Sequence, residues 1–190
     1  MAKLVYDETG RLLFTKEMKE EYTLLMPQML PVHFGMMQKL LECEGYKVDM
    51  LTTNHRGIVD EGLKYVHNDT CYPALLVIGQ FLDALGSGKY DLDHTALIIT
   101  QTGGGCRASN YIHLLRKALE KADMAYIPVV SVNLSGMEKN PGFDIMTIPF
   151  IRKAVFAMMY GDLIVNVANQ VRPYEVEAGA TDAMIEHWSQ

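Results

Sequence analysis

Cys71 and Cys106 each stand before an apolar segment with helical spacing. Before Cys106 come three glycines, and before these glycines comes the continuous apolar run 96–99. This order predicts a strand buried on both faces, a glycine turn and then a helix. A helix N-terminus offers free backbone N–H groups and a partial positive charge, both of which stabilise a thiolate. We therefore predict that the function of the chain depends on these two cysteines.

The residue types alone leave three roles open for these thiols. Thiolates on neighbouring loops are typical ligands of an iron–sulfur cluster, which normally takes three or four of them. A catalytic cysteine would need a base, and His113 lies about two helical turns beyond Cys106, too far to activate it directly. His55 or His67 could approach through space. The third role is that of a buried structural thiol.

The glycine segment also matches part of a dinucleotide-binding fingerprint. Gly103, Gly105 and Ala108 fit the pattern G-x-G-x-x-A between a predicted strand and a predicted helix. However, the next predicted strand runs to Asn133 without the acidic residue that would bind a ribose. The absence of a lysine after the glycines excludes a nucleoside-triphosphate P-loop. The partial match is a weak signal, so the binding of a nucleotide or of the CoA phosphates remains an alternative function.

Length and composition limit the classes of protein that fit. A chain of 190 residues with 49% hydrophobic content is expected to form a single domain, 1–190, with a charged lead-in over residues 1–20. The net charge of −6 argues against nucleic-acid binding. No apolar run is long enough to cross a membrane, and no signal-peptide pattern opens the chain. Three cysteines, an odd number, then indicate reduced thiols in the cytoplasm.

The elements that would position the cysteines alternate along the chain. Four strands interleaved with helices predict a Rossmann-like, three-layer α/β domain with a mostly parallel sheet of four or five strands. Ligands of such sheets bind at the carboxyl ends of the strands, where we place the loops before Cys71 and around Cys106. The expected strands are 23–26, 46–51, 96–100 and 127–132, with 163–167 as either a fifth strand or part of a helix from Pro149; the expected helices cover 32–45 and the segments after Cys71, Cys106 and Pro173, while 54–62 is expected to be mostly loop.

Two motifs of this sequence resemble a known superfamily. They are N-D-T-C-Y-P-A at 68–74 and I-T-Q-T-G-G-G-C-R-A-S-N-Y at 99–111. Together with N-L-S-G-M-E-K-N-P-G-F at 133–143 and R-P-Y-E at 172–175, they resemble the 2-hydroxyacyl-CoA dehydratase superfamily. Within this superfamily, the sequence more closely resembles a C-terminal-type module of the large CoA-substrate-specific enzyme activases. These activases are related to activators of 2-hydroxyglutaryl-CoA dehydratase. The resemblance covers nearly all of the chain.

The resemblance implies a cofactor and a set of site residues. In that superfamily, Rossmann-like domains hold a [4Fe–4S] cluster through cysteines on such loops, and the electron that it carries serves radical dehydration of a 2-hydroxyacyl-CoA in anaerobic metabolism. Cys71 and Cys106 resemble the cluster ligands, and a third motif cysteine is missing. Small residues would let the cluster or a ligand approach the backbone, and an arginine would offset thiolate charge. These predicted cofactor-binding residues are Gly103, Gly104, Gly105 and Arg107.

The resemblance also implies partners. The ATPase segment of the activases is absent from this sequence, so the chain resembles a module of a larger protein or assembly and is not expected to be a complete enzyme alone. The implied partners are a dehydratase or activase subunit and an acyl-CoA. Two alternatives stay open: a cluster-free interaction domain that docks on such a partner, and a binder of nucleotide or CoA phosphate. Self-association is a further expectation, with Met184, Ile185 and Trp188 in the final helix as one candidate surface.

Overall fold

A computed structural model of the chain describes residues 3–101, 110–133, 138–145 and 147–189. The chain divides into two compact units, and each is built from two separate segments. The first unit comprises residues 1–27 and 45–144, and the second comprises residues 28–44 and 145–190. We describe each unit by itself.

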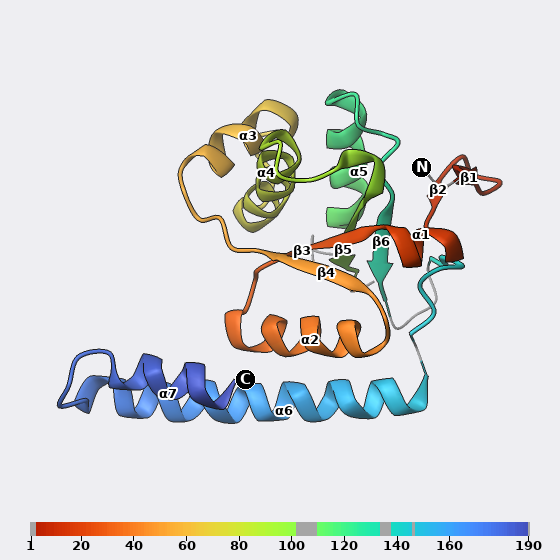
Figure 1. The fold of residues 1–190 in the computed structure, drawn as a ribbon. Coiled ribbons are helices and arrows are strands. Elements are labelled where there is room, and N and C mark those ends of the chain that lie inside the picture. Colours follow the sequence, from red (N-terminus) through yellow and green to blue (C-terminus); the bar gives the residue numbers. More distant parts are fainter. Residues whose placement is uncertain (1–2, 102–109, 134–137, 146, 190) are drawn as a thin grey trace. The chain divides into compact units, whose positions relative to one another are not determined.

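The first unit contains a four-stranded sheet in which every pairing is parallel. The strands lie in the order β4-β3-β5-β6 (Figure 1). The predicted α/β, Rossmann-like class with a mostly parallel sheet flanked by helices is therefore confirmed, with four strands. Their bounds are β3 (Thr23–Pro27), β4 (Lys47–Leu51), β5 (Thr95–Thr100) and β6 (Val129–Val132).

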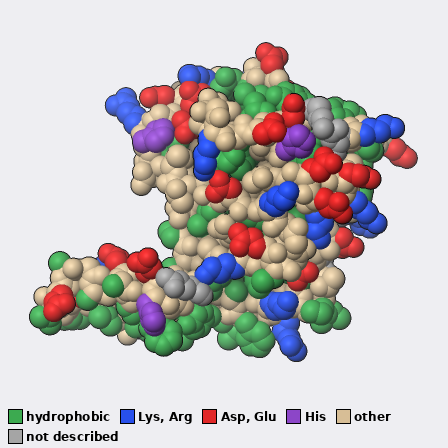
Figure 2. Space-filling view, in the orientation of Figure 1, with side chains coloured by type: hydrophobic (Ala, Val, Ile, Leu, Met, Phe, Trp, Pro, Cys, Tyr) green, Lys and Arg blue, Asp and Glu red, His purple; other side chains and the backbone are tan. Residues whose placement is uncertain are grey.

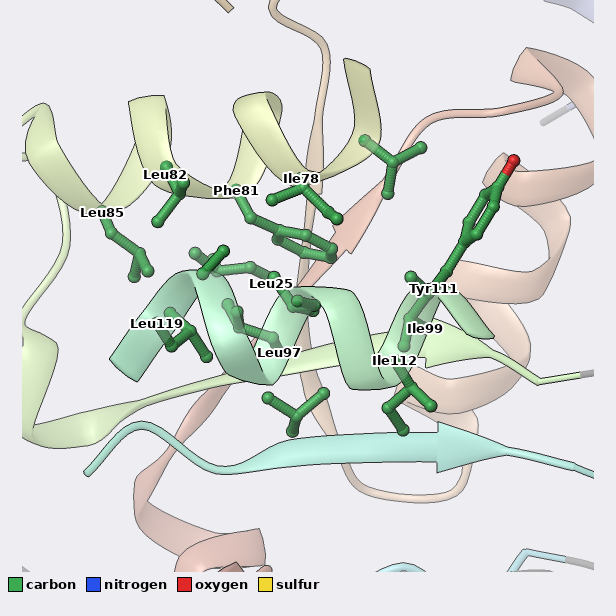
Figure 3. Close-up of a cluster of buried hydrophobic side chains, with 14 of the residues drawn as sticks. Leu25, Ile78, Phe81, Leu82, Leu85, Leu97, Ile99, Tyr111, Ile112 and Leu119 are labelled. Carbon is green, nitrogen blue, oxygen red and sulfur yellow. The ribbon is translucent and has the colours of Figure 1, made fainter. Parts of the chain in front are cut away.

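Helices of the first unit cover one face of this sheet (Figure 1). Their apolar side chains form one core with the central strands, and in Figure 3 Ile78 and Phe81 lie opposite Leu25 and Leu97. All four of these side chains are fully or almost fully buried, so this core is the main stabilising feature of the unit. The helices are α3 (Gly57–Tyr65), α4 (Tyr72–Gly86) and α5 (Tyr111–Lys121), and the short 3-10 turn η1 (Leu92–His94) leads into β5.

The lead-in segment forms a hairpin and a short helix. Strands β1 (Val5–Tyr6) and β2 (Leu12–Leu13) pair antiparallel, as expected for a turn around Gly10, which has a positive φ of 79°. Bonds from the hydroxyl and amide of Thr9 and the amide of Arg11 lower the pKa of Asp7 to about 2 and hold the turn. Helix α1 (Lys16–Glu21) follows, with Thr15 as its N-cap.

The second unit consists of helices. Helix α2 (Pro31–Cys43) packs against the 24-residue helix α6 (Ile148–Val171), which contacts α7 (Ala180–Trp188). A Cβ added at Gly161 of α6 would lie 2.6 Å from the ring of the buried His33, so only a glycine allows this close approach. His33 Nε2 also lies 3.0 Å from Asp162 Oδ1.

The sequence-based assignment needs two corrections, and one alternative is decided. Of the segment 54–62, expected to be mostly loop, residues 57–62 belong to α3, which continues to Tyr65 and packs closely on α4. The segment 163–167, which could have been a fifth strand or part of a helix, continues α6. The segment after Pro173 begins with the 3-10 turn η3 (Arg172–Tyr174), and the final helix starts only at Ala180. Of the helices in the described ranges, none is both long and apolar enough to cross a membrane.

Candidate functional site at the carboxyl edge of the sheet

The strand order places a topological switch point between β3 and β5. From β3 the chain goes to β4 on one side, and it later returns to β5 on the other side. Parallel sheets bind ligands outside the carboxyl ends of the strands at such a point. The chain leaves β5 here through Gln101 and enters the glycine–cysteine segment, as the sequence predicted. The predicted site residues Gly103, Gly104, Gly105, Cys106 and Arg107 themselves lie outside the described residues.

Cys71 lies at the same edge of the sheet. It is the N-cap residue of α4, as predicted, and its side chain is partly buried. Its Sγ lies 3.2 Å from the hydroxyl of Tyr111, the first residue of α5. In Figure 3 the Tyr111 hydroxyl points away from the buried hydrophobic cluster, which includes Ile99 and Ile112. The thiol therefore lies beside the helix that follows Cys106 by five residues in the sequence.

A chain of buried polar side chains lies at the ends of β5 and β6, which sequence reasoning missed. Ser131 donates a hydrogen bond to Gln101 Oε1 over 2.8 Å, and Asn133 Nδ2 donates to the Ser131 hydroxyl over 2.9 Å. Asn133 Nδ2 also donates to the carbonyl oxygen of Glu138, at 3.3 Å. These bonds connect Gln101, the residue after β5, with residues that come before and after 134–137 in the sequence. The only sequence signal was one serine within an apolar strand.

Glu138 is held by two arginines. Arg116 of α5 binds it with both terminal nitrogens, at 2.8 and 2.7 Å, and Arg11 Nη1 lies 2.8 Å from Oε2. Burial by itself would raise the pKa of Glu138, but the bonds and charges of Arg116 and Arg11 outweigh it, so the pKa lies below its usual value. These groups line a hollow of about 730 Å³ between the hairpin and α5. Because both guanidiniums are paired with Glu138, we assign them a structural role.

The end of β4 is fixed by a buried amide of α4. Gln80 Nε2 donates to the carbonyl oxygens of Leu51 and Thr53, at 3.1 and 2.7 Å. The Thr53 hydroxyl oxygen is itself buried and has no hydrogen-bond partner among the described residues. The carboxyl ends of β4, β5 and β6 thus all carry buried polar groups.

The other candidate residues belong to the second unit or form bonds of their own. Cys43 is the last residue of α2 in the second unit and is exposed. His55 Nδ1 accepts a bond from the amide of Gly57, and His67 Nδ1 accepts one from the amide of Asp69. Neither bond involves Cys71, so these contacts do not support a catalytic thiol.

Among the described residues, Cys71 is the one thiol at this edge of the sheet that could serve as a metal ligand. Within the described ranges, no group of three or more His, Cys, Asp and Glu side chains could hold a metal ion. Cys106 is the one further thiol that the sequence places at this edge, so the chain would supply at most two thiolates to a site there. A partly buried thiol at a helix start is suited to such a role.

No family model matches the chain, and searches of curated proteins and of solved structures return no match.

Proposed function

We propose that this chain is an iron–sulfur-associated module of a radical 2-hydroxyacyl-CoA dehydratase system. Within it the chain would act in electron transfer in the cytoplasm, and it would not be a complete enzyme alone. The observation that carries the proposal is the 3.2 Å contact between Cys71 Sγ and the Tyr111 hydroxyl. It brings one motif thiol to the start of the helix that follows the other motif cysteine.

Two residues of this chain would hold the cluster. Cys71 and Cys106 would each provide a thiolate, and the remaining ligands would come from a dehydratase or activase subunit. A bound [4Fe–4S] cluster would supply one-electron transfer. Tyr111 would orient the sulfur of Cys71, and the N-terminus of α4 would stabilise its negative charge. The glycines at 103–105 would leave space for the cluster beside the backbone.

Anaerobic reconstitution with iron and sulfide tests this proposal. Dithiothreitol would be present as an external thiolate to complete the ligand set. We expect a brown protein with iron–sulfur absorbance and an EPR signal after reduction. Cys71→Ser and Cys106→Ser should each lose bound iron, whereas the matched control Cys43→Ser should keep it. Circular dichroism would check that all three variants remain folded.

Two outcomes would overturn the proposal. A colourless wild-type protein would favour the cluster-free interaction domain. Loss of iron in Cys43→Ser to the same extent as in Cys71→Ser would indicate non-specific binding to thiols.

The switch point favours a second candidate function, the binding of a nucleotide or of CoA phosphate. Strand β5, which the glycine segment follows in the sequence, ends at the edge where parallel sheets bind such ligands. The buried Thr53 hydroxyl is an additional polar group at this edge of the sheet. Calorimetric titration with ATP and with an acyl-CoA tests this function, and a Gly104→Val variant should lose any binding that depends on the glycines. Equal binding heats for the wild type and for Gly104→Val would show that binding does not depend on the glycines.

A further inference from the structure

Helix α6 carries an apolar stripe that the chain leaves exposed. The buried face of α6 consists of Phe150, Gly161, Ile164 and Ala168. On the rest of its surface, nine large apolar side chains are 41–84% exposed, and six of them recur at helical intervals along almost the whole helix. Figure 2 shows hydrophobic side chains over α6 and α7. The apolar stripe consists of Ile148, Val155, Phe156, Met159, Leu163 and Val167.

The charged side chains of α6 leave this stripe almost free of charge. Lys153 Nζ lies 3.7 Å from a Glu44 carboxylate oxygen, and Asp162 Oδ1 lies 3.0 Å from His33 Nε2. Each of these charges has a partner in α2 or in the residue after it, but the Asp162 side chain is still 78% exposed. Arg152 is the one other charged residue in α6. A partner helix would therefore have to accommodate the Arg152 cation and the exposed side of Asp162.

We propose that the apolar stripe of α6 binds the same stripe of a second copy of this chain, with the two helices antiparallel around a two-fold axis at Met159. In this register Val155 would lie opposite Leu163, and Arg152 opposite Asn166. A parallel arrangement would instead bring Arg152 next to its own copy, which like-charge repulsion disfavours. Of the two directions, the antiparallel one avoids this repulsion.

The exposed area of the stripe approaches that of a standard dimer interface. A fully exposed aromatic side chain offers roughly 150–250 Å², which serves as an upper value for the aliphatic members of the stripe. At their exposed fractions, the six side chains together present at most roughly 500–900 Å². A standard protein–protein interface buries about 800 Å² per partner. Contacts at the edge of the stripe would supply the remainder. This inference is independent of the proposed cluster, which depends on the other unit.

A charge at position 159 provides the sharpest test, because each copy would meet its own substitution at the two-fold axis. Light scattering on the full chain at about 10–100 µM should give a dimer for the wild type. Met159→Glu and Met159→Lys should each raise the dimer dissociation constant by at least about 100-fold through repulsion. An equimolar mixture of these two variants should form a heterodimer, because opposite charges then meet.

Leu63→Glu is the matched control, because Leu63 is an apolar residue of α3 that is 48% exposed and lies outside the stripe. This variant should keep the mass of the wild type. Three results would overturn the proposal. They are a monomeric wild type, a Met159→Glu variant as dimeric as the wild type, and a mixture of the two charged variants that stays monomeric. A monomeric wild type would mean that another partner, or the chain itself, covers the stripe.

Discussion

Helices α4 and α6 are both rich in apolar residues, but they use them differently. Ten of the fifteen residues of α4 are buried, against four of the twenty-four residues of α6. In the sequence, α4 comes between strands β4 and β5, and its buried side chains contribute to the core of the first unit. Helix α6 follows the last strand and buries one narrow face. The apolar content of a helix thus indicates how much surface it can bury but not what covers that surface.

Two phenylalanines test this comparison most strongly. Phe81 of α4 is fully buried, whereas Phe156 of α6 is 62% exposed. We expect Phe81→Ala to lower the free energy of unfolding by about 3–5 kcal/mol, because it removes core contacts and leaves a cavity. Phe156→Ala should change it by less than about 0.5 kcal/mol in dilute solution. Urea denaturation at low protein concentration measures both, and similar losses would contradict the assigned burial.

Two glycines of α4 test how closely its neighbours pack. A Cβ added at Gly79 would lie 1.9 Å from the carbonyl oxygen of Ile58 in α3, which cannot move away without distorting that helix. We expect Gly79→Ala to cost about 3 kcal/mol of stability. Gly86→Ala is the control, because nothing lies within 4 Å of its added Cβ. That variant should be neutral or more stable by about 0.5 kcal/mol. Thermal unfolding should therefore separate the two variants by roughly 6–14 °C.

The ion pairs of the two units should differ in their response to acid. The pKa of Glu138 is lower in the folded protein, so its pairing with Arg116 and Arg11 stabilises the fold above the ordinary value of 4.5 and is lost as the pH falls below it. Glu138→Gln should cost about 1–3 kcal/mol at pH 7. The difference from the wild type should shrink as the pH drops through this range. Asp182→Asn, which breaks an exposed pair with Arg172 in the second unit, should have little effect at any pH.

The smallest expected effect concerns Tyr111. Tyr111→Phe removes the hydroxyl beside Cys71 and should cost about 1 kcal/mol or less, because the ring remains packed at the start of α5. The rate at which a disulfide reagent modifies Cys71 should change, whereas the rate at Cys43 in the other unit should not. Mass spectrometry after timed modification separates the two sites, and equal changes at both would contradict the contact.

The sequence predicted the four strands and the position of Cys71 well, because apolar runs and helix starts are local patterns. It did not predict α3, whose polar residues resemble a loop. This helix packs closely on α4 through Gly62 and Gly79, whose added Cβ atoms would lie 2.5 Å from Leu75 O and 1.9 Å from Ile58 O. Such packing is a tertiary interaction that no local pattern shows.

The polar chain at the carboxyl edge was also beyond prediction. Gln101 and Ser131 are separated by 30 positions and become partners only because β5 and β6 are adjacent. Each residue by itself is ordinary in its local sequence. Cys71 was recognisable because a thiol before an apolar helix is unusual, but its neighbour Tyr111 was not, since an aromatic residue at a helix start is common.

The second unit is assembled from segments that leave the ribosome at different times. Its helix α2 is complete long before α6 appears, because the segment 45–144 of the first unit is synthesised in between. At a synthesis rate of about 5–20 residues per second, on the order of 5–20 s pass between the synthesis of α2 and that of α6, the helix that packs on it. During this interval His33 lacks both Asp162 and the close backbone of Gly161. Nascent chains stalled before residue 145 would therefore expose α2 to chaperones, whereas those released after residue 171 would have both halves of the α2–α6 pair.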